Sequence, residues 1–164
     1  MPSLIEKFTQ LVEQSDDKQQ QLLHEIVDRL LRHTAGDHTY RFPLNALIGT
    51  TGETLADSGI VRVPNTAAIG NSLGYPHGGI IATIADGAMG RIATARAAVH
   101  GKKVVTSNLH VHYLATTTAD ELIATGTIIK EGRSVIVTDC TVTDSTGREL
   151  AYATATFQVI VPRT

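Results

Sequence analysis

Residues 71–86 read Asn-Ser-Leu-Gly-Tyr-Pro-His-Gly-Gly-Ile-Ile-Ala-Thr-Ile-Ala-Asp and form the most informative segment of the chain. A polar turn with glycines precedes an apolar helix, and Asp86 follows about two turns inside that helix. The free N–H groups and positive dipole end of a helix start suit a developing oxyanion, and a lone carboxylate is costly to bury. N–H donors with one carboxylate are sufficient for acyl-transfer hydrolysis. The plainer alternative, a Pro-Gly-Gly helix entry with Asp86 exposed or paired with Arg91, stays open and is favoured by the residue types alone.

The segments that follow predict one buried helix and a long antiparallel sheet. Residues 76–99 are rich in Ala and Ile with few charges, so we expect a buried helix that Gly101 terminates. The remaining residues are rich in Val, Ile and Thr and are interrupted by hairpin-like turns. The four expected strands, connected in series as a meander, are Val104–Leu114, Glu121–Lys130, Ser134–Thr143 and Glu149–Val161. This order predicts an α+β fold with the sheet wrapped on the helix.

The N-terminal part of the chain predicts a helical extension. Apolar residues recur at helical spacing over residues 3–33, with a polar break at 15–17 that can cap a second helix. Gly36 ends this region, so we expect an extension over residues 1–36 and a second domain over residues 37–164. Two further short strands are expected, at Leu44–Ile48 and Ile60–Val63.

Composition excludes several classes of protein. The chain has 164 residues, enough for a hydrophobic core, and a net charge of −2, which is unlike a nucleic-acid or anionic-membrane binder. The N-terminal extension is itself slightly acidic, with four Lys or Arg against six Asp or Glu. The lone cysteine, Cys140, fits a buried position in a reducing compartment, and no signal peptide or membrane span is visible. We therefore expect a cytoplasmic protein that binds neither nucleic acid nor membrane.

The order of the motifs resembles the hotdog-fold acyl-CoA thioesterases of the phenylacetate-pathway (PaaI) type. Their signature is an Asn, a short turn, His-Gly-Gly, six residues and an Asp, and it is similar to the segment quoted above. Three later segments are also similar to this family: Thr106–Leu114 with its Tyr-Leu end, the Gly-Arg hairpin at 130–134 and the last turn at 144–151. The resemblance covers roughly residues 45–160 and implies a hotdog fold, acyl-CoA as substrate, and no cofactor.

The spacing between Gly78 and Asp86 indicates a site shared between two chains. Eight residues of helix separate them by about 12 Å, whereas a thioester carbonyl sits about 3 Å from its donors and its attacker lies equally close. Two antiparallel helices, each giving its N-terminus to the other's carboxylate, resolve this mismatch and require a homodimer. The resemblance implies the same arrangement, and we expect the dimer to assemble further into a homotetramer.

Each candidate residue has a functional and a structural interpretation. In the functional one, the Gly78 N–H binds the thioester oxygen while the partner's Asp86 acts as general base or as nucleophile, which the sequence does not separate. The other candidates are Asn71, which can bond the carbonyl or the water or else only shape a turn, and His77, which can line the substrate site or be structural. Thr106 matches the family's Ser or Thr that assists the carboxylate. Gly79 and Arg133 are candidate substrate contacts, with Arg133 reaching CoA phosphates or remaining a solvated turn residue.

A metal site is a minor alternative. His110 and His112 form a His-x-His pair and, by simple strand alternation, share a face with Thr106 and Asn108. No nearby Cys or well-spaced acid completes a ligand set, so we expect a polar exposed sheet face and no metal.

Two other functions remain as alternatives. One is a hotdog hydratase or dehydratase, although its typical helix motif is missing here. The other is a non-catalytic acyl-CoA-binding protein, which would be expected to lack Asp86 or to carry a basic DNA-binding segment. The chain has no Gly-x-Ser-x-Gly elbow and no His-Glu-x-x-His motif, which argues against other hydrolases. The acyl group itself is not readable from the sequence.

Overall fold

The structure of the protein is a computed structural model that describes residues 1–40 and 42–161. It forms two compact units, Met1–Gly49 and Thr50–Thr164. The first unit extends past residue 36, the boundary expected from the sequence. Two hydrogen-bond contacts explain this: His33 Nδ1 lies 2.6 Å from Tyr40 O, and Arg29 Nε donates to Ala46 O at 2.8 Å.

The first unit contains the expected pair of helices, α1 (Leu4–Gln14) and α2 (Asp17–Thr34). Each begins with a reciprocal capping box, Ser3 with Glu6 in α1 and Asp16 with Gln19 in α2, so local side chains satisfy the free N–H groups of both starts. A short 3-10 turn, η1 (His38–Tyr40), follows.

The expected strand at Leu44–Ile48 is wrong, because these residues lie in a third helix, α3 (Pro43–Ile48). Pro43 occupies its first position, where the fixed φ of proline suits a helix and the missing N–H costs nothing. Gly49 ends the helix in the left-handed region, with φ 77°. The short apolar run was compatible with either structure, and its flanking Pro and Gly favour the helix.

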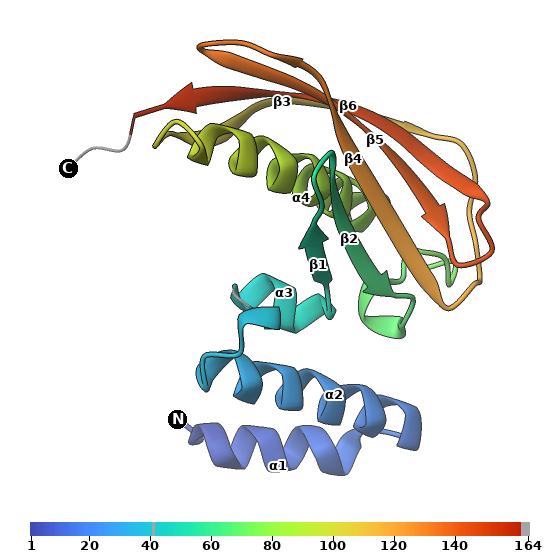
Figure 1. Cartoon of the computed structure of the whole chain (residues 1–164). Helices are drawn as coiled ribbons and strands as arrows, with labels where there is room; N and C mark the ends of the chain where they lie inside the picture. The colour runs from blue at the N-terminus through green and yellow to red at the C-terminus, as the bar shows by residue number, and fades with distance from the viewer. Residues whose placement is uncertain (41, 162–164) are drawn as a thin grey trace. The chain divides into compact units, whose positions relative to one another are not determined.

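The second unit has the α+β hotdog arrangement that the sequence predicted. A six-stranded antiparallel sheet curves over the long helix α4 (Gly78–Ala98), as Figure 1 shows. The strands lie in the order β1-β2-β4-β5-β6-β3. Their bounds are β1 Thr51–Thr54, β2 Ser58–Pro64, β3 Lys103–Tyr113, β4 Glu121–Glu131, β5 Val135–Asp144 and β6 Glu149–Ile160, and a 3-10 turn, η2 (Ala67–Ile69), precedes the helix.

The strand connections differ from the expected meander in one respect. Strands β4, β5 and β6 are joined in series by tight turns, but β3 pairs with β6 at one end of the sheet rather than with β4. The connection from β3 to β4 therefore crosses the ends of two strands. Its hydrogen-bond partners are supplied by the last turn, where Leu150 O accepts from Leu114 N at 2.9 Å.

Helix α4 approaches the sheet closely because two strands carry glycine beneath it. A Cβ atom built on Gly126 of β4 would lie 2.6 Å from Met89 N, and one on Gly59 of β2 would lie 2.2 Å from Ala88 O. The sheet-facing helix residues are buried: Ile81, Ile84, Ala85, Ala88, Met89, Ile92, Ala93 and Ala97. This packing holds the N-terminal end of α4 and Asp86 in a rigid frame.

Candidate active site

The first turn of α4 is capped by a side chain, and one of its backbone N–H groups has no acceptor among the described residues. His77 is the N-cap residue, and its Nδ1 accepts a hydrogen bond from Gly79 N at 2.9 Å. Nδ1 is therefore unprotonated, and the neutral ring carries its proton on Nε2. The His77 carbonyl accepts from Ile80 N at 2.9 Å and Ile81 N at 3.2 Å. Among the described residues no acceptor is bonded to Gly78 N, so this N–H points out of the turn as a free donor.

Asn71 performs the structural role foreseen for it and keeps its donors. Its Oδ1 accepts from Leu73 N at 2.9 Å and from Tyr75 N at 3.2 Å, which folds the turn that leads to the helix. Within residues 1–40 and 42–161 the Nδ2 group has no hydrogen-bond acceptor. The turn interpretation and an interaction of the amide with a ligand are thus compatible.

Asp86 lies on α4 with its carboxylate bonded to β3. Thr106 Oγ1 donates to Asp86 Oδ1 at 3.0 Å, so the structure brings these two candidates together. The expectation that Asp86 is buried is wrong for the single chain, since the residue is only half-buried. β3 is an end strand of the sheet, so Asp86 lies where the cover of the sheet over α4 ends.

A β-bulge in β3 overturns the expected grouping of its polar residues. Thr106 pairs with Phe157, and Asn108 pairs with Thr156, so one residue of β3 is left without a partner between them. The extra residue reverses the alternation of side chains. Thr106 consequently faces α4, whereas Asn108 and the two histidines of the His-x-His pair lie on the outer face of the sheet.

The described residues do not supply a set of metal ligands. Among the described residues no group of three or more His, Cys, Asp or Glu side chains is placed to hold a metal ion. His110 Nε2 instead lies 3.2 Å from Asn108 Nδ2. Cys140 is buried, and desolvation raises the pKa of its thiol to about 12, so it is a protonated core residue at neutral pH.

The two candidate substrate contacts have different positions. The Gly79 N–H is already bonded to His77, as described above. Arg133 lies on the β4–β5 hairpin and lines a hollow of about 490 Å³ beside Ala97 near the end of α4. Ala97 is about 28 Å along the helix from Gly78, so Arg133 does not reach the helix mouth of its own chain. His100, Lys102 and Glu131 line the same hollow, and Glu131 is paired with Arg96.

Tyr113 lies against the first residue of α4, and no function was expected for it from the sequence. Its hydroxyl donates to Gly78 O at 2.9 Å and joins the end of β3 to the first residue of α4. No sequence signal links these residues, because they are 35 positions apart and the contact depends on where β3 enters the sheet.

With this geometry in hand, the chain can be compared with known proteins. Residues 73–151, which run from the turn before α4 into β6, match the family model described as Thioesterase superfamily. No helix among the described residues is long and apolar enough to cross a membrane.

Several solved structures share the fold, and two of the three that follow are named as thioesterases. The BH2602 protein of Bacillus halodurans, solved with CoA, is 27% identical, and the match has a TM-score of 0.86 and covers 96% of this chain and 100% of that one. A thioesterase family protein of Silicibacter pomeroyi is 24% identical, with coverage of 79% and 98% and a TM-score of 0.67. The thioesterase HI1161 of Haemophilus influenzae is 18% identical, with coverage of 74% and 85% and a TM-score of 0.66. None of the curated proteins matches the chain.

The coverage also bears on the N-terminal helices. A match to 96% of 164 residues leaves about seven residues unaligned, so it must include most of α1 and α2. The two lower-identity structures support the hotdog fold alone. The Bacillus protein therefore also has segments that align with the N-terminal helices of this chain.

Proposed function

We propose that this protein is an acyl-CoA thioesterase of the PaaI type, which hydrolyses acyl-CoA to a free acid and CoA. The observation that carries the proposal is the pairing, on one helix, of a free N–H at Gly78 with a half-exposed carboxylate at Asp86 that Thr106 orients. The similarity to a structure solved with CoA supports the choice of thioester.

The proposed chemistry uses these groups in two roles. The Gly78 N–H and the positive end of α4 stabilise the oxyanion that forms when the thioester carbon is attacked. Asp86 either takes a proton from the attacking water and passes it to the CoA sulfur, or attacks the carbon itself and forms an acyl anhydride that water then hydrolyses to the free acid. CoA leaves as the thiol in the first route and as a thiolate that solvent protonates in the second. The Nδ2 group of Asn71 and the Nε2–H of His77 are further donors at the helix mouth, available to the carbonyl or the water.

The proposed site takes its two halves from two chains. Gly78 and Asp86 are about 12 Å apart along α4, which is too far for one thioester group. The sheet order supports a second copy as the partner: β3 is an end strand, Val105 on this strand is exposed, and the exposed Leu114 follows it directly. In a two-fold dimer with antiparallel α4 helices, each Gly78 meets the partner's Asp86. A homotetramer of two such dimers completes the proposal.

The hollow beside Ala97 is a candidate site for the phosphates of CoA. Arg133 and Lys102 line it, the one acidic lining residue, Glu131, is paired with Arg96, and guanidinium groups bind phosphate oxygens in pairs. In the proposed dimer the C-terminal end of one α4 lies toward the mouth of the other. The long CoA chain would extend from the reacting carbonyl to this hollow on the partner.

The test is a panel of short-chain, long-chain and aromatic acyl-CoAs, with CoA release followed by a thiol reagent. Matching acyl-pantetheine thioesters, which lack the nucleotide phosphates, report on the hollow through KM. We expect Asp86→Asn to keep the shape of the side chain but to lower kcat about a hundredfold or more, because an amide neither accepts the proton nor attacks.

Asp139→Asn is the matched control. Asp139 is also half-buried and hydroxyl-bonded, but it lies on the outer face of the sheet beside Tyr152. It should retain full activity. An Asp86→Asn protein that keeps more than about a tenth of the wild-type kcat contradicts the assignment. Tight binding of acyl-CoA without CoA release would instead identify a binding protein, and reversible hydration of an enoyl-CoA would identify a hydratase.

A further inference from the structure

The peptide unit between Gly78 and Gly79 is held at both ends by side chains. Its carbonyl, Gly78 O, accepts from the Tyr113 hydroxyl at 2.9 Å, and its N–H, at Gly79, donates to His77 Nδ1 at 2.9 Å. The neighbouring peptide is held through the His77 carbonyl by the first turn of α4. The free Gly78 N–H belongs to the His77–Gly78 peptide unit, which meets the Gly78–Gly79 unit at the Cα atom of Gly78, so hydrogen bonds hold the units on both sides of that atom.

We propose that Tyr113 is a positioning residue that aims the Gly78 N–H at the thioester oxygen. The inference rests on the proposed thioesterase function and names a residue that this function requires. Tyr113 touches neither substrate nor water in this role. It acts through the Gly78–Gly79 peptide unit, which shares the Cα atom of Gly78 with the peptide unit that carries the donor, so a shift of the first would displace the second.

Consecutive glycines give this contact its importance. Without Cβ atoms, Gly78 and Gly79 have wide conformational freedom, so the backbone alone does not hold one orientation. The contact also explains why residue 78 is a glycine, since a Cβ atom there would lie 3.3 Å from Tyr113 Cζ. Because glycine is small, the Tyr113 ring can approach Gly78, and the hydroxyl of the ring then restricts the backbone conformation there.

The bulge in β3 makes this arrangement possible. Thr106 and Tyr113 are seven residues apart, and in a regular strand an odd separation would place them on opposite faces. The additional residue between Thr106 and Asn108 puts both on the side of α4, where they bond to Asp86 and to Gly78. A single strand thus orients the carboxylate and the oxyanion donor of each chain.

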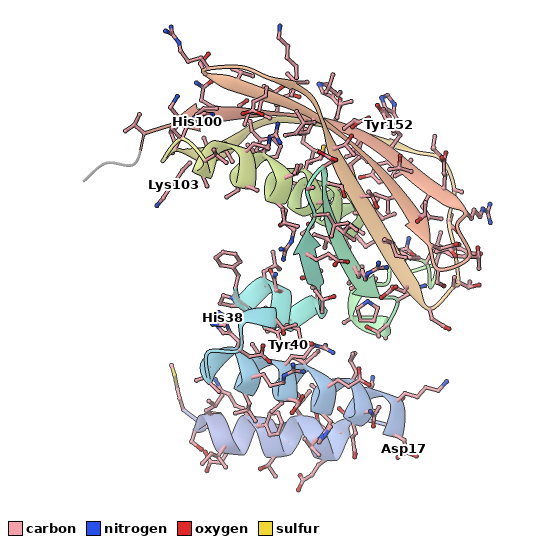
Figure 2. All side chains as sticks on the ribbon, viewed as in Figure 1. Asp17, His38, Tyr40, His100, Lys103 and Tyr152 are labelled. Atoms are coloured by element: carbon pink, nitrogen blue, oxygen red, sulfur yellow. The ribbon has the colours of Figure 1, made fainter. Side chains whose placement is uncertain are left out.

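The test compares Tyr113→Phe with Tyr152→Phe. Both changes remove one hydroxyl from a partly exposed ring, 55% exposed for Tyr113 and 39% for Tyr152. Tyr152 bonds to Asp139 at 3.2 Å and lies on the outer face of the sheet (Figure 2). We expect Tyr113→Phe to lower kcat by a factor of about two to ten, the value of one net hydrogen bond, with KM unchanged. Tyr152→Phe should match the wild type.

A second measurement tests the effect of the Tyr113 hydroxyl on the start of α4 in the absence of substrate. Amide hydrogen exchange at Gly79, followed by NMR, should accelerate by a similar factor of about two to ten in Tyr113→Phe and not in Tyr152→Phe. If the wild type hydrolyses no thioester, the proposed function fails, and unchanged Gly79 exchange in Tyr113→Phe would separately overturn the positioning role. With an active enzyme, an unchanged kcat, or a raised KM with constant kcat, overturns the inference, because the ring would then act on the substrate or not at all.

Discussion

Two carboxylates in this protein have very different surroundings. Asp86 is half-buried and accepts from the hydroxyl of Thr106. Asp144, the last residue of β5, is buried and accepts from the Thr117 hydroxyl at 2.7 Å and from the backbone and hydroxyl of Thr146. These bonds, led by that of Thr117, lower the pKa of Asp144 to about 2. Asp144 is thus a structural anion that joins two turns, whereas Asp86 remains open to a ligand.

This difference predicts an acid-labile element of stability at Asp144. Its pKa is lower in the folded protein than the ordinary Asp value of about 3.9, so its stabilising effect is complete above that value. The effect declines as the pH falls from about 4 toward 2, where the folded-state carboxylate becomes protonated.

We expect Asp144→Asn to lower the melting temperature at pH 7 and to reduce the difference in stability between pH 7 and pH 3. Thermal unfolding followed by circular dichroism across this range is the measurement. Asp139→Asn serves again as the control. An Asp144→Asn protein with the same acid dependence as the wild type would show that other groups carry it.

Glycines in the sheet allow the backbone of helix α4 to pack closely against it. The sheet residue Gly126 leaves room for the helix backbone at Met89, and nothing flexible lies at that contact to move aside. We expect Gly126→Ala to destabilise the fold by about 1–3 kcal/mol, because the helix or the strand must shift. Chemical denaturation gives the free energy of unfolding.

A glycine on the helix provides the control for this prediction. A Cβ atom on Gly90 would lie 3.5 Å from Phe157, an ordinary van der Waals distance. Gly90→Ala should therefore be neutral or stabilise by up to about 1 kcal/mol through its helix propensity. Equal losses in both variants would show that the close approach at Gly126 is not the cause.

For the whole molecule, the proposed shared site predicts that two inactive chains complement each other. Asp86→Asn removes the carboxylate. Asn71→Asp keeps the oxygen that folds the turn and removes the amide donors, so the turn should persist. Random mixing of the two chains makes half the dimers mixed, each with one intact site, so roughly a quarter of the wild-type activity should return.

The measurement is thioester hydrolysis after co-expression or joint refolding of the two variants. Each variant refolded alone should recover no activity. If the mixture stays at the mean of its parents while mass spectrometry shows exchanged subunits, the site does not combine Asn71 of one chain with Asp86 of the other.

Much of the fold followed from local pattern. Apolar spacing and polar breaks predicted α1, α2 and α4, and Val, Ile and Thr predicted β3 to β6, because caps and turns act over a few residues. The segment from Asn71 to Asp86 also marked the helix mouth and its carboxylate. Helix α3 was the local failure, since a short apolar run suits either kind of element.

The other features of the fold and of the candidate site depend on strand pairing between residues that are far apart in the sequence. The place of β3 beside β6 joins residues as distant as Thr106 and Phe157, and the bulge there reversed the expected face of Thr106. The same pairing brings Tyr113 to Gly78. The side-chain alternation of a strand is local, but its register and its irregularities depend on the partner strand. The sequence therefore indicated Asp86 and Gly78 as candidate site residues, and the pairing of the sheet determined which side chains form hydrogen bonds with them.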